Sequence, residues 1–125
     1  MKSNPNPVGW FEIYVQDMDR AKAFYEKTFD AVLERIESSG VEMQAFPMKH
    51  ESPGCAGALV KMSGKDSGAG GTIVYFPGED CAAMAERAVT NGGTIQTQKK
   101  AIGEHGFIAH VVDTEGNLIG LHSMK

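Results

Sequence analysis

The second half of this sequence follows the same order of apolar, polar and glycine-rich segments as the first half. Few of the matched residues are identical, but two periods of 62 fill the 125 residues. A shift of 62 positions pairs Trp10 with Thr72, Ile13 with Tyr75, Asp17 with Glu79, Leu33 with Ile95 and Leu59 with Leu121. Since each period of such a repeat is one supersecondary unit, we expect a duplicated module.

The first period predicts a strand, a helix and three further strands. Residues 8–16 are rich in aromatic and β-branched types, as strands are. Asp17 is a good N-cap, and apolar residues at spacings of three and four predict a helix over about 18–29. Segments of strand composition, separated by turn residues, follow at 31–38, 41–48 and 56–62.

The second period repeats this order after a flexible connector at 63–71, which has four glycines in nine residues. A strand at 72–76 precedes a helix capped by Glu79 or Asp80. Further strands are expected at 94–102, 106–112 and 118–122. We therefore expect a single domain over residues 1–125, with module one at about 6–62 and module two at about 72–123.

Charge and cysteine content exclude several partners. Lys and Arg number 12 against 16 Asp and Glu, and no stretch concentrates positive charge, so we expect neither nucleic acid nor a membrane as partner. Charged residues throughout the first 30 positions leave no room for a signal peptide, and no run approaches the roughly 20 apolar residues of a membrane span. With only two cysteines, the sequence favours a reducing compartment and a cytoplasmic location.

One face of the first strand is apolar, and the other carries Trp10, Glu12 and Tyr14. A small sheet covered by a helix on one side and lined by aromatic, Met, Glu and His residues on the other is typical of a concave, half-apolar surface. Such surfaces bind small molecules.

In residues 10–25 a strand ends in Asp17, a helix begins with Arg-Ala and a Phe-Tyr pair follows, and residues 106–117 form a glycine-containing hairpin. These two stretches resemble the opening and the last hairpin of the vicinal oxygen chelate superfamily, which includes glyoxalase I, bleomycin and fosfomycin resistance proteins and extradiol dioxygenases. The resemblance implies an α+β fold of two tandem β-α-β-β-β modules. These would form an open, cup-shaped mixed sheet with helices on the outer face, often as a homodimer. It leaves the function open.

In the enzymes of the family, the resemblance implies a divalent metal held by His, Glu or Gln on the first and last strands of each module. Position by position, these ligands fall on Trp10, Ala58, Thr72 and Gly120. Indole and methyl groups offer no lone pair, glycine has no side chain, and a neutral hydroxyl is a weak ligand. We expect the usual metal site to be missing.

Glu12 is the most informative single residue. A carboxylate among aromatic and β-branched neighbours must find hydrogen-bond donors, water or a ligand, because isolated burial of a charge costs several kcal/mol. It is the candidate catalytic residue, as a general base, or it anchors a cationic or hydroxylated ligand. Alternatively, it faces water at an open rim.

Two functions therefore remain open. The first is a protein without cofactor that binds a small organic ligand through Trp10, Glu12, Thr72, Phe76, Gly120 and His122. The second is a glyoxalase-like lyase or isomerase, or a dioxygenase, whose divalent metal occupies a displaced site at Glu12, His110 and His122. Tyr14 and Phe76 could instead pack between modules. Exposed sheet edges favour a homodimer in either case.

Overall fold

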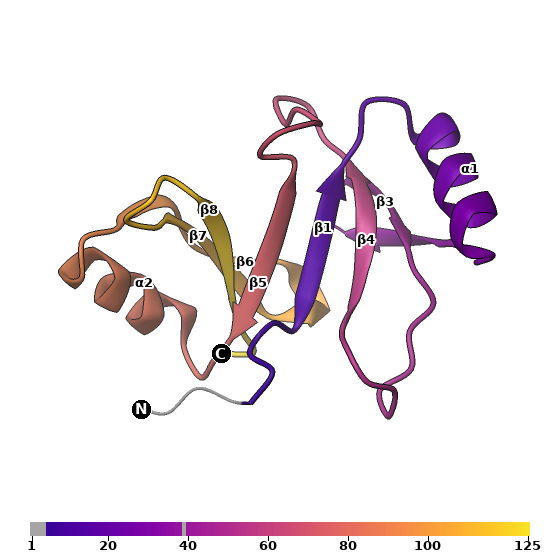
Figure 1. Ribbon diagram of the computed structural model, residues 1–125. Helices are drawn as coiled ribbons and strands as arrows, with labels where there is room; N and C mark the ends of the chain where they lie inside the picture. The colour runs from indigo at the N-terminus through magenta and orange to yellow at the C-terminus, as the bar shows by residue number, and fades with distance from the viewer. Residues whose placement is uncertain (1–4, 39) are drawn as a thin grey trace. The chain divides into compact units, whose positions relative to one another are not determined.

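Both halves of the chain fold in the order β-α-β-β-β, as the repeat predicts (Figure 1). The structure is a computed structural model that describes residues 5–38 and 40–125. The first module, Trp10–Thr72, contains β1 (Trp10–Tyr14), α1 (Met18–Phe29), β2 (Glu34–Ser38), β3 (Val41–Ala45) and β4 (Ala56–Lys61). The second module consists of Ile73–Lys125 and the segment that ends at Gly9. It contains β5 (Thr72–Pro77), α2 (Cys81–Thr90), β6 (Thr94–Ala101), the 3-10 turn η1 (Gly103–His105), β7 (Phe107–Val112) and β8 (Leu118–Ser123). Thr72, the first residue of β5, belongs to the first module.

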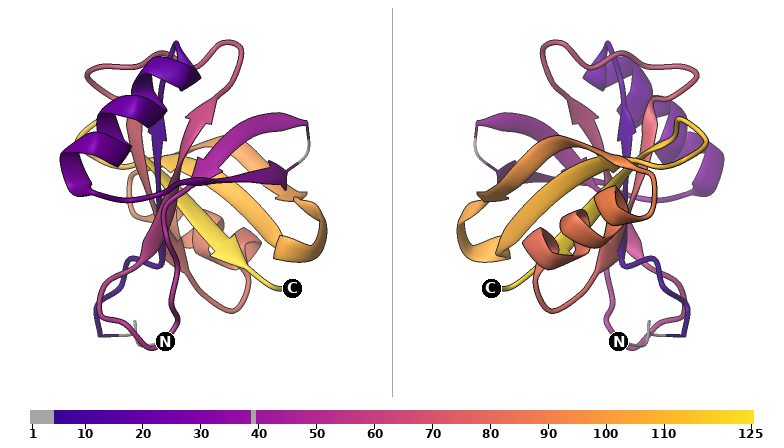
Figure 2. Two further views of the ribbon diagram at one scale, coloured as in Figure 1. Left: turned by 90° about the vertical axis from the view of Figure 1, so that its right-hand side faces the viewer. Right: turned by 90° about the vertical axis from the view of Figure 1, so that its left-hand side faces the viewer.

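The strands of the first module lie in the order β2-β3-β4-β1, with β1 parallel to β4 and the other pairs antiparallel. Helix α1 covers one face of this sheet (Figure 2). The core beneath it includes Val15, Met18, Leu33 and Leu59, with Ile13 packed against them. Phe11 contacts Phe46 on this same side. The expected apolar face of β1 is therefore the face that α1 covers, and Glu12 lies on the helix-free face.

The second module orders its strands β5-β8-β7-β6, with β5 parallel to β8 and the remaining pairs antiparallel. Helix α2 packs on one face, where Cys81, Ala85, Ala109, Val111 and Leu121 form the buried core (Figure 2). Neither helix of the described residues is long and apolar enough to cross a membrane.

The two N-caps fix how the modules correspond. Asp17 Oδ1 accepts a hydrogen bond from the Arg20 N–H at 3.0 Å, and Asp80 Oδ1 accepts one from the Ala82 N–H at 2.9 Å. These caps are 63 residues apart, whereas the last strands, β4 at Ala56–Lys61 and β8 at Leu118–Ser123, correspond at a shift of 62. The structural equivalent of Trp10 is therefore Ile73, one residue after the predicted Thr72.

Asp80 also ties α2 to β6. Lys99 Nζ lies 3.0 Å from Asp80 Oδ1 and 4.8 Å from the centre of the Phe107 ring. The Lys99 side chain, followed by the Ala82 N–H, holds the pKa of the Asp80 carboxyl below its usual 3.8. A carboxylate whose pKa is lowered on folding stabilises the fold above its unfolded-state pKa, and that contribution is lost as the pH falls through the lowered value.

We predict that Asp80→Asn lowers the melting temperature at neutral pH, because Asn still caps the helix but cannot pair with Lys99. The difference from the natural protein should shrink below about pH 4, where the carboxylate becomes protonated. Thermal unfolding followed by circular dichroism between pH 3 and 7 measures both effects. A difference that stays constant over this range would rule out the assigned charge contribution.

Candidate functional site

Glu12 is held by its two neighbours on the helix-free face of the first module. The Tyr14 hydroxyl donates to Glu12 Oε1 at 2.8 Å, and Trp10 Nε1 donates to Glu12 Oε2 at 3.3 Å. The three side chains meet because residues two apart on a strand point to the same side. The carboxylate has thus found donors, as the sequence argument requires, and its orientation is fixed. A carboxylate held in this way can accept hydrogen bonds from a ligand or take a proton.

Small residues on β4 lie beside this group. Ala56 is the register partner of Trp10, and Ala58 is the partner of Glu12. Ala58 is fully buried, whereas Trp10 and Glu12 are half-buried. Beside the indole and the carboxylate, β4 therefore contributes only the methyl groups of Ala56 and Ala58.

Tyr75 and His110 form the corresponding polar group of the second module. Across the sheet, Tyr75 on β5 is the partner of Gly120 on β8, which is the partner of His110 on β7. The Tyr75 hydroxyl and His110 Nε2 lie 2.9 Å apart in a hydrogen bond, and the two rings meet edge-on at 5.7 Å. Both side chains are buried.

His122 lies two residues beyond Gly120 on the same face of β8. Its Nε2–H donates to the carbonyl oxygen of His105 at 2.6 Å, which ties β8 to η1. The side chain is half-buried. This hydrogen bond occupies His122 Nε2.

Phe76 and Thr72 lie on the opposite face from the one predicted. Phe76 packs against the α2 core, and Thr72 shares its parity on β5. The expected face of this strand is therefore wrong by one residue, and Ile73 and Tyr75 occupy the helix-free side instead. Sequence reasoning missed Tyr75, because the sequence leaves the second N-cap open between Glu79 and Asp80, and only the cap at Asp80 gives the shift of 63 that places Tyr75 on this side.

The residues at the metal positions that the resemblance implies do not fit a divalent cation. Trp10, Ala58 and Gly120 lie at these positions, and Ile73 takes the place assigned to Thr72; none of these side chains donates a lone pair of useful strength. The displaced set divides between the modules, with Glu12 in the first and His110 and His122 in the second. Within residues 5–38 and 40–125, no three His, Cys, Asp or Glu side chains are arranged to hold a metal ion.

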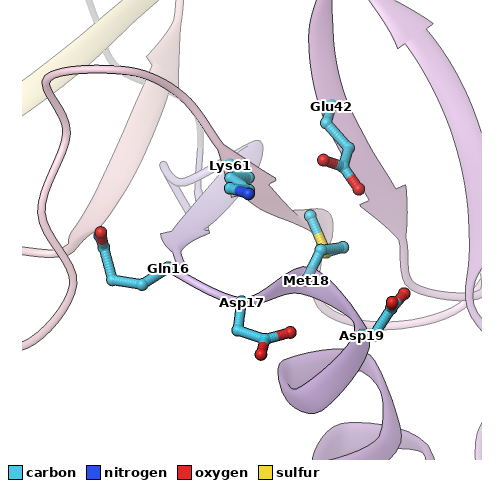
Figure 3. A pocket seen from close by; sticks show the side chains of 6 residues that line it. All are labelled: Gln16, Asp17, Met18, Asp19, Glu42 and Lys61. Atoms are coloured by element: carbon cyan, nitrogen blue, oxygen red, sulfur yellow. The ribbon is translucent and has the colours of Figure 1, made fainter.

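An open hollow of about 420 Å³ lies at the start of α1, on the helix-covered side of the first sheet. Glu42 on β3 and Lys61 on β4 are register partners and line it together with the beginning of the helix. Figure 3 shows the side chains around it: Gln16, Asp17, Met18, Asp19, Glu42 and Lys61. Because Asp17 already caps α1 and the other charged groups are exposed, we interpret this hollow as solvated surface.

The model of the Glyoxalase/Bleomycin resistance protein/Dioxygenase superfamily matches residues 8–121, and the chain belongs to this superfamily. No relative was found among curated protein sequences.

Several solved structures share the fold at low sequence identity. Methylmalonyl-CoA epimerase from Mycobacterium tuberculosis is 17% identical with a TM-score of 0.67, covering 100% of this chain and 92% of that one. A hypothetical protein from Bacillus halodurans is 12% identical with a TM-score of 0.69, covering 94% of each chain. A methylmalonyl-CoA epimerase variant from Streptomyces coelicolor, in complex with 2-nitronate-propionyl-CoA, is 18% identical with a TM-score of 0.66, covering 94% and 93%. These similarities confirm the predicted α+β fold class and carry no substrate assignment.

Replacing Phe76 tests the corrected face of β5. We predict that Phe76→Ala lowers the free energy of unfolding by about 2 to 4 kcal/mol, because it opens a cavity in the α2 core. Thr72→Ala, on the same strand but exposed, should change it by no more than about 0.5 kcal/mol. Urea unfolding measures both values, and equal small effects would contradict the packing described here.

Proposed function

We propose that this protein binds a small organic molecule on the helix-free face of its first module, with Trp10 and Glu12 as contact residues and without the family's usual metal. The observation that carries the proposal is the exchange of residue types on β1 and β4. Where the family resemblance places metal ligands, Trp10 and Ala58 offer none, and two residues after Trp10 a carboxylate is held in a fixed orientation.

The chemistry of these groups suggests the kind of ligand. The Trp10 indole offers a flat apolar surface for stacking. The Glu12 carboxylate accepts hydrogen bonds, so it suits a ligand with a hydroxyl or ammonium donor. His122 remains a predicted contact on the second module's own helix-free face. Gly120 is left out of the proposal because the Tyr75 ring covers it, and Thr72 and Phe76 are left out because they lie on the α2 side.

Analysis of the protein as isolated tests the proposal directly. We predict that native mass spectrometry finds an organic molecule bound, and that elemental analysis after purification without chelator finds less than one metal ion per chain. Stoichiometric metal that disappears in Glu12→Ala or His122→Ala would contradict the proposal. That outcome would favour the metal-dependent lyase, isomerase or dioxygenase.

Substitution at Glu12 then tests the contact. Glu12→Gln should weaken binding of the molecule identified by mass spectrometry about 10- to 100-fold, since a hydrogen bond to a charged group contributes roughly 1.5 to 3 kcal/mol. The matched control is Glu34→Gln, because Glu34 is an exposed carboxylate on the outer strand β2 of the same sheet. Titration calorimetry compares the two, and an equal loss in both variants would argue against a specific role for Glu12.

The assembly and location are also part of the proposal. In their own modules β2 and β6 are outer strands, and pairing between copies of the chain would cover such edges. We expect a homodimer in light scattering at tens of micromolar, and a monomer at that concentration would contradict it. The free cysteines Cys55 and Cys81 agree with a cytoplasmic location.

A further inference from the structure

We infer that Tyr75, held in place by His110, closes the metal position of the second module by filling the space that any side chain at residue 120 would need. The inference rests on the proposed function, because it concerns the same loss of cation binding. It adds that the loss of cation binding in this module has a second cause besides the missing metal-ligating side chain, namely a specific aromatic residue.

The contact between Tyr75 and Gly120 leaves no space for a side chain. The two residues are register partners on the parallel strands β5 and β8. A Cβ atom added to Gly120 would overlap Cδ2 and Cε2 of the Tyr75 ring and lie 2.7 Å from Cγ. Real Cβ atoms essentially never come closer than 3.0 Å to another heavy atom. While the Tyr75 ring holds this position, only glycine fits at residue 120.

His110 prevents the ring from moving aside. Because His110 is the register partner of Gly120 on β7, it lies across β8 from Tyr75. The hydrogen bond of 2.9 Å between the phenol oxygen and Nε2 therefore spans Gly120. Tyr75 is 4% exposed and His110 is 7% exposed, so swinging the ring away would break a buried hydrogen bond. His110 is thus a positioning residue for Tyr75.

The first module shows that this closure is not required by the fold. There Glu12 occupies the place of Tyr75, and its register partner is Ala58, which has a Cβ. The duplicated framework therefore tolerates a side chain at this position of the last strand when no ring covers it. In the second module, changing Gly120 alone to a metal-ligating residue would not restore a metal ligand, because the Tyr75 ring occupies the space that the new side chain needs. Tyr75 therefore determines whether this position can bind a cation.

A double-mutant cycle tests the steric claim. Gly120→Ala in the natural protein should lower the melting temperature by about 5 to 15 °C, as overpacking of a buried site does. In a Tyr75→Ala background, the same change should cost at most a third of that shift. Tyr75→Phe should give an intermediate cost, because the ring remains but loses the hydrogen bond to His110 that holds it in place. As the matched control, Phe76→Ala and Gly120→Ala should have additive effects, since Phe76 faces α2. Equal costs of Gly120→Ala with and without Tyr75 would overturn the inference.

Cobalt binding tests the functional consequence. A Glu placed at residue 120 would lie beside His110 and two residues from His122, so it would have two potential partner ligands. We expect Tyr75→Ala/Gly120→Glu to bind Co²⁺ at least tenfold more tightly than Gly120→Glu, measured by visible absorption. Equal affinities would overturn the inference; if Gly120→Glu does not fold, the alanine cycle decides. Neither result depends on the metal or ligand content of the natural protein. Measuring that content is the separate test of the proposed function.

Discussion

The parallel pairing of the first and last strands in each module is the constraint on which the rest of the structure depends. It places a large polar side chain of the first strand against a very small residue of the last strand: Glu12 against Ala58, and Tyr75 against Gly120. Because strand side chains alternate between faces, this pairing also sends the neighbouring apolar residues under the helix. Helix cores and helix-free faces thus follow from the same register.

The chemistry of the helix-free faces rests on hydrogen bonds made within each module. In the first module, Trp10 and Tyr14 donate to both oxygens of the Glu12 carboxylate, and in the second module Tyr75 and His110 bond to each other. Such groups recognise the donors and acceptors of an organic ligand by direction. A cation site instead needs several side chains that donate lone pairs toward one point. The described helix-free faces thus present directional hydrogen-bonding groups, whereas Trp10, Ala58 and Gly120 offer no lone pair of useful strength to a cation.

Solved structures with this fold differ from this chain at most sequence positions. Proteins that are 12 to 18% identical share the fold with TM-scores of 0.66 to 0.69, so the backbone tolerates replacement of most side chains. Function must then be argued from the particular residues on the sheet faces rather than from the architecture. In this chain the informative residues are few, and most of them lie on β1, β5, β7 and β8.

The sequence by itself determined the order of elements, the cap at Asp17, the two faces of β1 and the absence of metal-binding types at Trp10, Ala58 and Gly120. The first three follow from local propensity and from alternation along one strand. The last follows from side-chain chemistry at positions that the family resemblance implies. Only the tertiary structure decided which residues of β5 face the helix, because that depends on pairing with β8. A shift of one residue exchanges the two faces of a strand. Hence Tyr75 rather than Phe76 stands over Gly120, and no pattern within β5 alone distinguishes the two aromatic residues.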